Sequence, residues 1–175
     1  MYYISGFYKF KKITNTKKNK KFLQTYFINK SIRGTIIISN EGINGTISAN
    51  KKNLDLVINK IKATFKFNNF DSVNLSMSKF QPFHRSKIKI KKEVVPMGIK
   101  VIKRKTKNHV DPIKWNQLIK DKNTFLIDAR KPFEHEVGTF KRSINPKVNN
   151  FREFPNYLKN LDKGKTIAMF CTGGI

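Results

Sequence analysis

One segment near the C-terminal end of the sequence combines a potential nucleophile with small residues. The only cysteine of the chain, Cys171, follows a short apolar run and precedes two glycines. Glycines let backbone N–H groups come close to a negatively charged sulfur, and such dipoles favour the reactive thiolate. A lone cysteine after an apolar strand is more often an inert core residue, but such a residue does not need these glycines. We therefore predict an active-site loop that comprises Cys171, Thr172, Gly173, Gly174 and Ile175.

A second pair of chemically active side chains, Asp128 and Arg130, follows an earlier apolar run. Residues 124–128 and 166–170 each predict a short buried strand, and helical patterns alternate with them. This alternation is typical of a parallel α/β sheet, in which ligands bind at the carboxyl ends of the strands. Asp128 and Cys171 are therefore expected at one edge. Because a buried charge must be paired, we interpret Asp128 and Arg130 mainly as a structural pair that supports the loops.

The first half of the chain predicts a different architecture. Strand patterns at 2–10, 34–39, 46–48 and 73–77 are interrupted by two helical patterns. The resulting order, β-α-β-β-α-β over residues 1–84, is typical of a ferredoxin-like α+β domain. Asn44-Gly45 predicts a tight turn within it, and Glu41 beside this turn belongs either to the turn alone or to a backbone anion site.

Residues 85–110 are strongly basic, and two interpretations of them remain open. Lysines alternate with isoleucines at 87–91, so that the charges share one side of an extended strand. The segment is either a basic connector between two domains or an edge strand that lysines keep soluble. Its candidate RNA-binding residues are Arg85, Lys87, Lys89, Lys91 and Lys92. The remainder, 111–175, forms the second predicted domain, whose first helix is expected to bury Ile113.

The composition limits the class of protein. The 175 residues carry 37 Lys and Arg against 11 Asp and Glu, a net charge of +26. Residues 1–110 hold 25 basic and 4 acidic side chains, so the excess lies mostly in the first part of the chain. Such a surface attracts polyanions, of which nucleic acid is the commonest, although lysine-rich drift over solvated faces is the alternative. The single cysteine excludes a disulfide framework and a multi-thiolate zinc site. No membrane span or secretory signal is present, so we expect a cytoplasmic protein without a membrane partner.

Several of these segments together resemble the rhodanese-like tRNA uridine hydroxylases. Asp128-Ala129-Arg130 and the following Glu134 are similar to the first half of a rhodanese domain, with Cys171 in the place of its active-site loop. The other matching segments are 33–36 (Arg-Gly-Thr-Ile), 41–46 (Glu-Gly-Ile-Asn-Gly-Thr), 87–89 (Lys-Ile-Lys), 93–98 (Glu-Val-Val-Pro-Met-Gly), 138–140 (Gly-Thr-Phe), 145–146 (Asn-Pro) and 171–175 (Cys-Thr-Gly-Gly-Ile). The resemblance covers nearly the whole chain. It implies an acylphosphatase-like domain followed by a rhodanese domain.

The resemblance also implies a reaction, the oxygen-dependent hydroxylation of the wobble uridine of tRNA to 5-hydroxyuridine. Cys171 would be the essential thiol, molecular oxygen the co-substrate and the tRNA anticodon loop the partner. The thiolate would add to C6 of uracil, or a modified Cys171 sulfur would relay the oxygen. We infer neither a metal nor an organic cofactor. His84, His109 and His135 lack the spacing of metal ligands and are interpreted as ordinary surface or interdomain residues.

The main departure of the sequence from the family pattern is at its end, beside a minor difference at Ala129 and Ser143. The sequence stops at Ile175, where a rhodanese loop continues with a basic residue and a helix. We therefore expect these 175 residues to be a fragment with little or no catalytic activity by themselves. Two other functions remain open: a sulfurtransferase that carries a persulfide on Cys171, and a non-catalytic RNA-binding remnant. The sequence does not indicate an oligomeric state.

Overall fold

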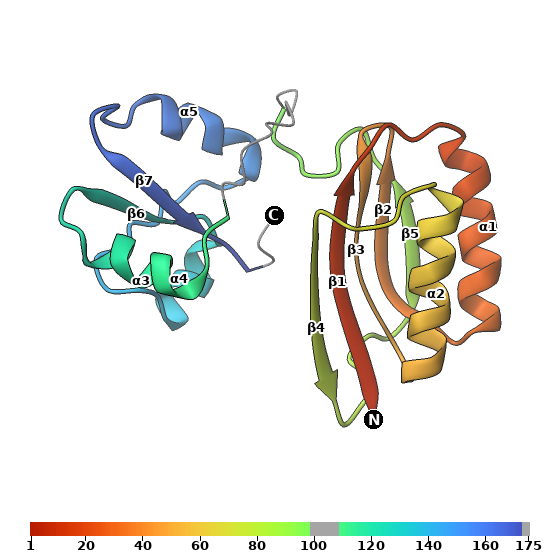
Figure 1. Ribbon diagram of the computed structural model, residues 1–175. Coiled ribbons are helices and arrows are strands. Elements are labelled where there is room, and N and C mark those ends of the chain that lie inside the picture. Colours follow the sequence, from red (N-terminus) through yellow and green to blue (C-terminus); the bar gives the residue numbers. More distant parts are fainter. Residues whose placement is uncertain (99–108, 173–175) are drawn as a thin grey trace. The chain divides into compact units, whose positions relative to one another are not determined.

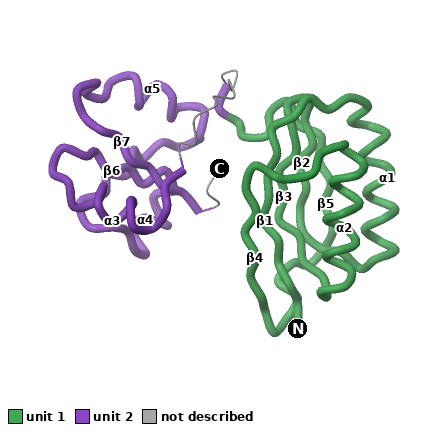
Figure 2. The backbone as a smooth tube through the Cα atoms, in the orientation of Figure 1, with its two compact units in different colours: residues 1–96, 175 green, residues 97–174 purple. Residues whose placement is uncertain are grey.

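The chain divides into two compact units. A computed structural model describes residues 1–98 and 109–172. The first unit comprises residues 1–96 and the second residues 97–174 (Figure 2). Among the described residues, no helix is both long enough and apolar enough to cross a membrane.

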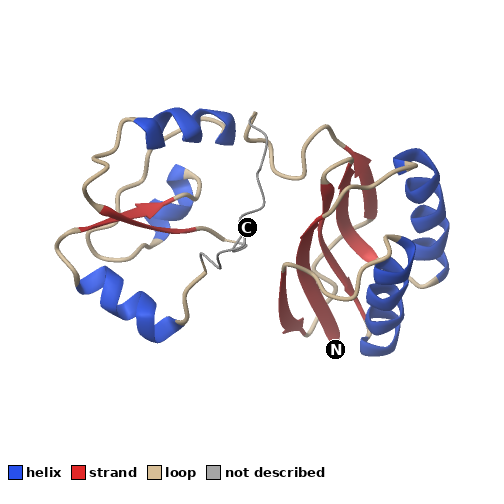
Figure 3. Cartoon of the chain, turned by 45° about the horizontal axis from the view of Figure 1, so that its top comes forward, coloured by secondary structure: helices blue, strands red, loops and turns tan. Residues whose placement is uncertain are grey.

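The first unit is a five-stranded sheet with two helices on one of its faces (Figures 1 and 3). Along the chain it contains β1 (Tyr2–Phe10), α1 (Thr16–Asn29), β2 (Arg33–Ser39), β3 (Gly42–Ala49), α2 (Lys51–Thr64), β4 (Ser72–Ser78) and β5 (Ser86–Ile90). The spatial order is β4-β1-β3-β2-β5, in which β5 runs parallel to β2 and the other neighbours are antiparallel. The first six elements confirm the predicted ferredoxin-like order.

The core of this unit lies between the sheet and its helices. Helix α1 contributes Leu23 and Phe27, one turn apart, and α2 contributes Leu54, Val57 and Ile61. Both sets repeat at three- and four-residue spacing, which places them on one helical face. The strands contribute alternate residues to the same core, namely Phe7, Ile36, Ile38, Ile43, Ile47 and Ile88. Amphipathic periodicity therefore determines which face of each element is buried.

The predicted turn at Asn44-Gly45 is wrong. Both residues lie inside β3, and the turn between β2 and β3 is formed by Asn40 and Glu41. A Cβ atom on Gly45 would stand 2.9 Å from the carbonyl oxygen of Thr35 and 3.2 Å from the Phe7 ring. The glycine is therefore required by close packing between neighbouring strands and not by a turn.

The basic segment after residue 85 begins with an edge strand. In β5, Ile88 is buried in the core, and the alternation directs Lys87 and Lys89 to the face that the helices leave uncovered. Beyond this strand, the Val94 N–H donates to the Glu41 carboxylate at 2.6 Å, and the Val94 side chain is buried. The boundary of the first unit therefore moves from 84 to 96. The remaining part of the predicted connector, residues 99–108, lies outside the described residues.

The second unit contains a pair of parallel strands and short helices. Its elements are α3 (Pro112–Lys120), β6 (Thr124–Asp128), α4 (Pro132–Val137), the 3-10 turn η1 (Phe151–Glu153), α5 (Phe154–Lys159) and β7 (Thr166–Phe170). Strands β6 and β7 are parallel, as the sequence predicts, and an isolated parallel bridge joins Ile127 to Ile144. Asp111 begins α3 by accepting a hydrogen bond from the Lys114 N–H at 2.8 Å. Ile113, expected in the core, is exposed instead.

We predict that Gly45→Ala lowers the free energy of unfolding by about 1–3 kcal/mol, because the new methyl group must displace backbone and a packed ring. Urea denaturation followed by circular dichroism measures this loss. Gly6→Ala is the matched control, since the nearest atom to its Cβ would be the Thr46 hydroxyl at an ordinary 3.7 Å. Equal losses for the two variants would contradict the packing argument.

Candidate active site

The parallel pairing of β6 and β7 brings the predicted acid and the predicted thiol to one sheet edge. Asp128 is paired with Phe170, the residue before Cys171. The Ala129 N–H donates to the Phe170 carbonyl at 2.9 Å, so the two chain segments stay adjacent beyond the last strand residues. The expected convergence of Asp128 and Cys171 at the carboxyl ends of the strands is thus confirmed.

The carboxylate of Asp128 is completely buried and accepts several hydrogen bonds. Arg130 donates through its Nε at 2.8 Å and its Nη2 at 2.7 Å, a bidentate arrangement, and its backbone N–H adds a third bond at 3.1 Å. The Thr139 hydroxyl donates at 2.8 Å, and His135 Nδ1 lies 3.2 Å from the same carboxylate. The charge of Asp128 is therefore compensated from several directions.

These contacts determine the ionisation of Asp128. Burial by itself would raise the pKa of Asp128, because it disfavours the charged form. The hydrogen bonds from Arg130 and Thr139 outweigh burial and hold the pKa of Asp128 well below its ordinary value of 3.8. The carboxylate is consequently ionised at neutral pH, as a salt-bridge partner of Arg130 must be.

Arg130 connects this buried charge to an aromatic cluster. Its Nη2 also donates to the Gly138 carbonyl at 2.6 Å, and its guanidinium lies 5.3 Å from the centre of the Phe170 ring. Phe170 and Phe140 meet edge to face, with centroids 5.0 Å apart, and Trp115 contacts both rings. The planar guanidinium is thereby fixed by the carboxylate on one side and placed over an aromatic face.

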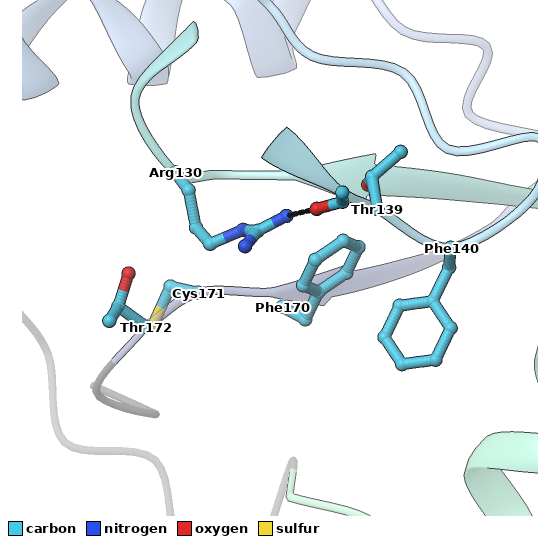
Figure 4. A pocket seen from close by; sticks show the side chains of 7 residues that line it. Arg130, Thr139, Phe140, Phe170, Cys171 and Thr172 are labelled. Atoms are coloured by element: carbon cyan, nitrogen blue, oxygen red, sulfur yellow. Dashed lines mark hydrogen bonds between the residues drawn. The ribbon is translucent and has the colours of Figure 1, made fainter. Parts of the chain in front are cut away.

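A pocket of about 380 Å³ opens beside this cluster (Figure 4). The side chain of Cys171, which is partly exposed, is one of its walls. The other lining residues are Arg130, Gly138, Thr139, Phe140, Phe170 and Thr172. The pocket therefore combines a thiol, a guanidinium and two aromatic rings. Together these groups could bind a ligand that contains a polar, unsaturated ring.

A hydrogen bond attaches the cysteine loop to the neighbouring helix. The Thr172 hydroxyl donates to Glu134 Oε1 at 2.6 Å, and Glu134 Oε2 accepts the Lys131 N–H at 3.1 Å. The bond from Thr172, together with the one from Lys131, lowers the pKa of Glu134. Glu134 thus bridges the residue after Cys171 and the beginning of α4.

The sequence identified some members of this site and missed others. Asp128, Arg130, Cys171 and Thr172 come together as predicted, and Arg130 lines the pocket in addition to its structural pairing. Gly173, Gly174 and Ile175 lie outside the described residues. His135, interpreted as an ordinary histidine, contacts the buried carboxylate instead. These contacts could have been predicted, because a buried carboxylate needs several hydrogen-bond donors. The polar residues that follow Asp128 in the sequence, such as Thr139, are the natural candidates.

The candidate RNA-binding residues lie in the first unit. Lys87 and Lys89 belong to β5, and Arg85, Lys91 and Lys92 flank it as exposed residues. In the described ranges 1–98 and 109–172, no group of three or more His, Cys, Asp or Glu side chains could hold a metal ion.

Comparison with known proteins gives three results. The family model of the UPF0176 acylphosphatase-like domain matches residues 2–94. A relative from Pelagibacter ubique (strain HTCC1062), named tRNA uridine(34) hydroxylase, is 63% identical over 176 residues, which cover 100% of this chain and 58% of the relative. The chain therefore spans less than two thirds of that relative's length. Acylphosphatase from Bacillus subtilis, a solved structure, is 12% identical with a TM-score of 0.37 and is matched over 50% of this chain and 98% of its own.

The Asp128 pairing predicts an acid-dependent loss of stability. Because its pKa is depressed in the folded state, Asp128 contributes stability above pH 3.8, and this contribution is lost as the pH falls towards the folded pKa. We expect Asp128→Asn to lose about 2–3 kcal/mol of unfolding free energy at pH 7 and progressively less below pH 4. Denaturant titrations from pH 7 to pH 2 measure this convergence. Asp162→Asn, an exposed carboxylate in the same unit, is the control. A difference between wild type and Asp128→Asn that stays constant with pH would contradict the pairing.

Proposed function

The chain belongs to the UPF0176 family, and on that premise we propose that it acts in the hydroxylation of uridine 34 of tRNA. The observation that carries this proposal is the pocket at the carboxyl ends of β6 and β7, with Cys171 as one wall. The 63% identity to a relative named for this activity supports it. We further propose that the second unit is the first part of a rhodanese domain, because it has parallel strands with Asp128 and Cys171 at their ends.

The pocket has features that suit a pyrimidine base. Its volume of about 380 Å³ is in the range of small-molecule sites, and the Phe140 and Phe170 rings supply apolar contact surface. Single-stranded RNA bases are commonly bound on aromatic and guanidinium planes, and Arg130 already lies over Phe170. In this proposal the wobble base is turned out of the anticodon loop and enters the pocket beside the sulfur.

The chemistry requires uracil C5 to become electron-rich. Addition of the Cys171 thiolate forms a bond from sulfur to C6, and the electron pair of the C5–C6 double bond moves to an enolate that reacts with oxygen at C5. One atom of molecular oxygen becomes the new hydroxyl. The other leaves as water when an external dithiol or two-electron carrier supplies two electrons and, in net, two protons. Loss of the C5 proton and of the thiolate restores the double bond. Thr172 and Glu134 would act as positioning residues that hold the cysteine loop.

The first unit is proposed to bind the tRNA. The uncovered face of its sheet carries Lys87 and Lys89 on the edge strand β5, and Lys91 continues the same alternation. Lysines on a rigid strand can contact successive phosphates, which gives affinity without sequence preference. In this proposal, contacts to the phosphates add to the binding energy that the pocket provides for the base.

A chimera tests the catalytic proposal. The 175 residues of this chain would replace the aligned residues of the Pelagibacter ubique relative, and nucleoside mass spectrometry would measure 5-hydroxyuridine in tRNA. We expect Cys171→Ser to abolish the product, because serine cannot supply a thiolate. We expect Thr172→Val to lower the rate about ten-fold to a hundred-fold, because the loop loses its hydrogen bond to Glu134, whereas Thr172→Ser keeps it.

Product formation by the Cys171→Ser chimera would overturn the proposal. Thiocyanate formation without 5-hydroxyuridine would favour a sulfurtransferase instead.

A triple substitution tests the tRNA-binding proposal. We expect Lys87→Gln, Lys89→Gln and Lys91→Gln together to weaken tRNA binding and to reduce the slope of log affinity against log salt by about 2–3. The matched control removes three exposed lysines from α1, on the helical side of the sheet: Lys17→Gln, Lys18→Gln and Lys21→Gln. Both triple variants lose the same net charge. Equal effects on filter-binding isotherms would show that only total charge matters and would refute a specific lysine face.

A further inference from the structure

The two edges of the five-stranded sheet differ sharply in charge. Strand β5 at one edge carries Lys87 and Lys89, a common protection against pairing with another chain. Strand β4 at the other edge, Ser72–Ser78, has no charged residue along its seven positions, although the chain has a net charge of +26. Among the described residues, β1 is the one strand hydrogen-bonded to β4. The outer edge of β4 therefore resembles an edge to which another strand can pair.

One side of β4 is apolar and exposed. Val73, Leu75 and Met77 are paired with Phe7, Ser5 and Tyr3 of β1, so they lie on the same side of the sheet as the two helices. They are nevertheless 50%, 73% and 64% exposed. The helices thus leave a row of three apolar side chains uncovered along this edge.

The sequence of β4 is complementary to itself in the antiparallel direction. A two-fold axis that passes between Leu75 and the partner's Leu75 would place these two residues opposite each other. Val73 would then lie opposite the partner's Met77. On the other face of the sheet, Ser72 would meet the partner's Ser78 and Asn74 the partner's Ser76. Apolar residues face apolar ones and polar residues face polar ones at every position. A shift by one residue would destroy this match, since successive side chains point to opposite faces.

The flanking charges agree with the same register. Asp71 directly precedes β4 and Lys79 directly follows it, so each Asp71 would lie opposite the partner's Lys79. Asp71 is held in place within its own chain, where its carboxylate accepts Lys9 Nζ and the Phe10 N–H, both at 2.8 Å. Opposite charges across antiparallel strands stabilise the pair. The equivalent pairing of β5 with itself would bring lysines together and is disfavoured.

We propose that β4 pairs with β4 of a second copy of this chain, in antiparallel register about Leu75, to form one continuous ten-stranded sheet. The two apolar rows join into one strip on the helical side and cover each other's edges. The like net charge of the two copies opposes this association, and salt screens that repulsion. The dimer is therefore favoured by higher salt, in contrast to RNA binding, which salt weakens.

Sedimentation equilibrium of the 175-residue chain in 0.1 and 1 M salt measures the association. We expect a dimer whose dissociation constant falls as salt rises, and a more than ten-fold weaker dimer for Leu75→Lys, which brings two ammonium groups together. Ile28→Lys is the matched control, because Ile28 is 74% exposed and its helix α1 packs against β2 and β5, at the opposite edge of the sheet from β4. A monomer at all concentrations and salts, or equal weakening by both variants, would overturn the proposal.

Disulfide trapping tests the register. In a Cys171→Ser background under a glutathione redox buffer, Leu75→Cys is expected to form a symmetric cross-link, since directly opposite Cβ atoms are about 5 Å apart. Val73→Cys is the control, because its two copies would be about 13 Å apart along the strands. A mixture of Val73→Cys and Met77→Cys should cross-link with each other. Cross-linking of Val73→Cys to itself, or a dimer in which Leu75→Cys fails to cross-link, would contradict this pairing.

Discussion

The second unit depends on the compensation of one buried charge. Asp128 has no exposed surface, so its carboxylate requires donors that approach from several elements. Arg130 comes from the loop after β6, His135 from α4, and Thr139 from the segment beyond that helix. Satisfying one carboxylate thus fixes the loops that line the pocket. Asn145 adds to this order, because its side-chain amide donates to the backbone carbonyls of Asp128 and Arg130.

The same pair links stability to the proposed chemistry. Arg130 is held by two bonds to Asp128 and is therefore preorganised over Phe170, next to the wall formed by Cys171. A rigid guanidinium loses little freedom when a base enters, which favours binding. The cysteine loop has its own connection through Thr172 and Glu134, so two independent contacts position the groups around the pocket.

Periodicity in the sequence predicted the order of the first six elements and the two parallel strands, one ending at Asp128 and the other just before Cys171, because burial leaves a regular pattern. Local signals were less reliable. Asn44-Gly45 has the composition of a hairpin turn, yet Gly45 is needed where strands pack closely, and a contact between distant strands leaves no local mark. The lysine-rich strand β5 has the composition of a linker, but its pairing with β2 depends on a partner about 50 residues away. Arg130 was predicted as the partner of Asp128, whereas the contacts from Thr139 and His135 were missed, since they depend on how the segment after β6 folds back onto the carboxylate.

In the proposed function, the Asp128–Arg130 pair holds the pocket in which Cys171 acts on uridine. This dependence is tested by the rate of 5-hydroxyuridine formation in the chimera that carries Arg130→Lys, which keeps the charge but loses the bidentate geometry. Arg142→Lys is the matched control, because Arg142 donates to the backbone carbonyl of Asp121 and does not line the pocket. We expect a more than ten-fold lower rate for Arg130→Lys, with an unchanged circular dichroism spectrum and normal activity in the control. Full activity of the folded Arg130→Lys chimera would contradict the role of the Asp128–Arg130 pair.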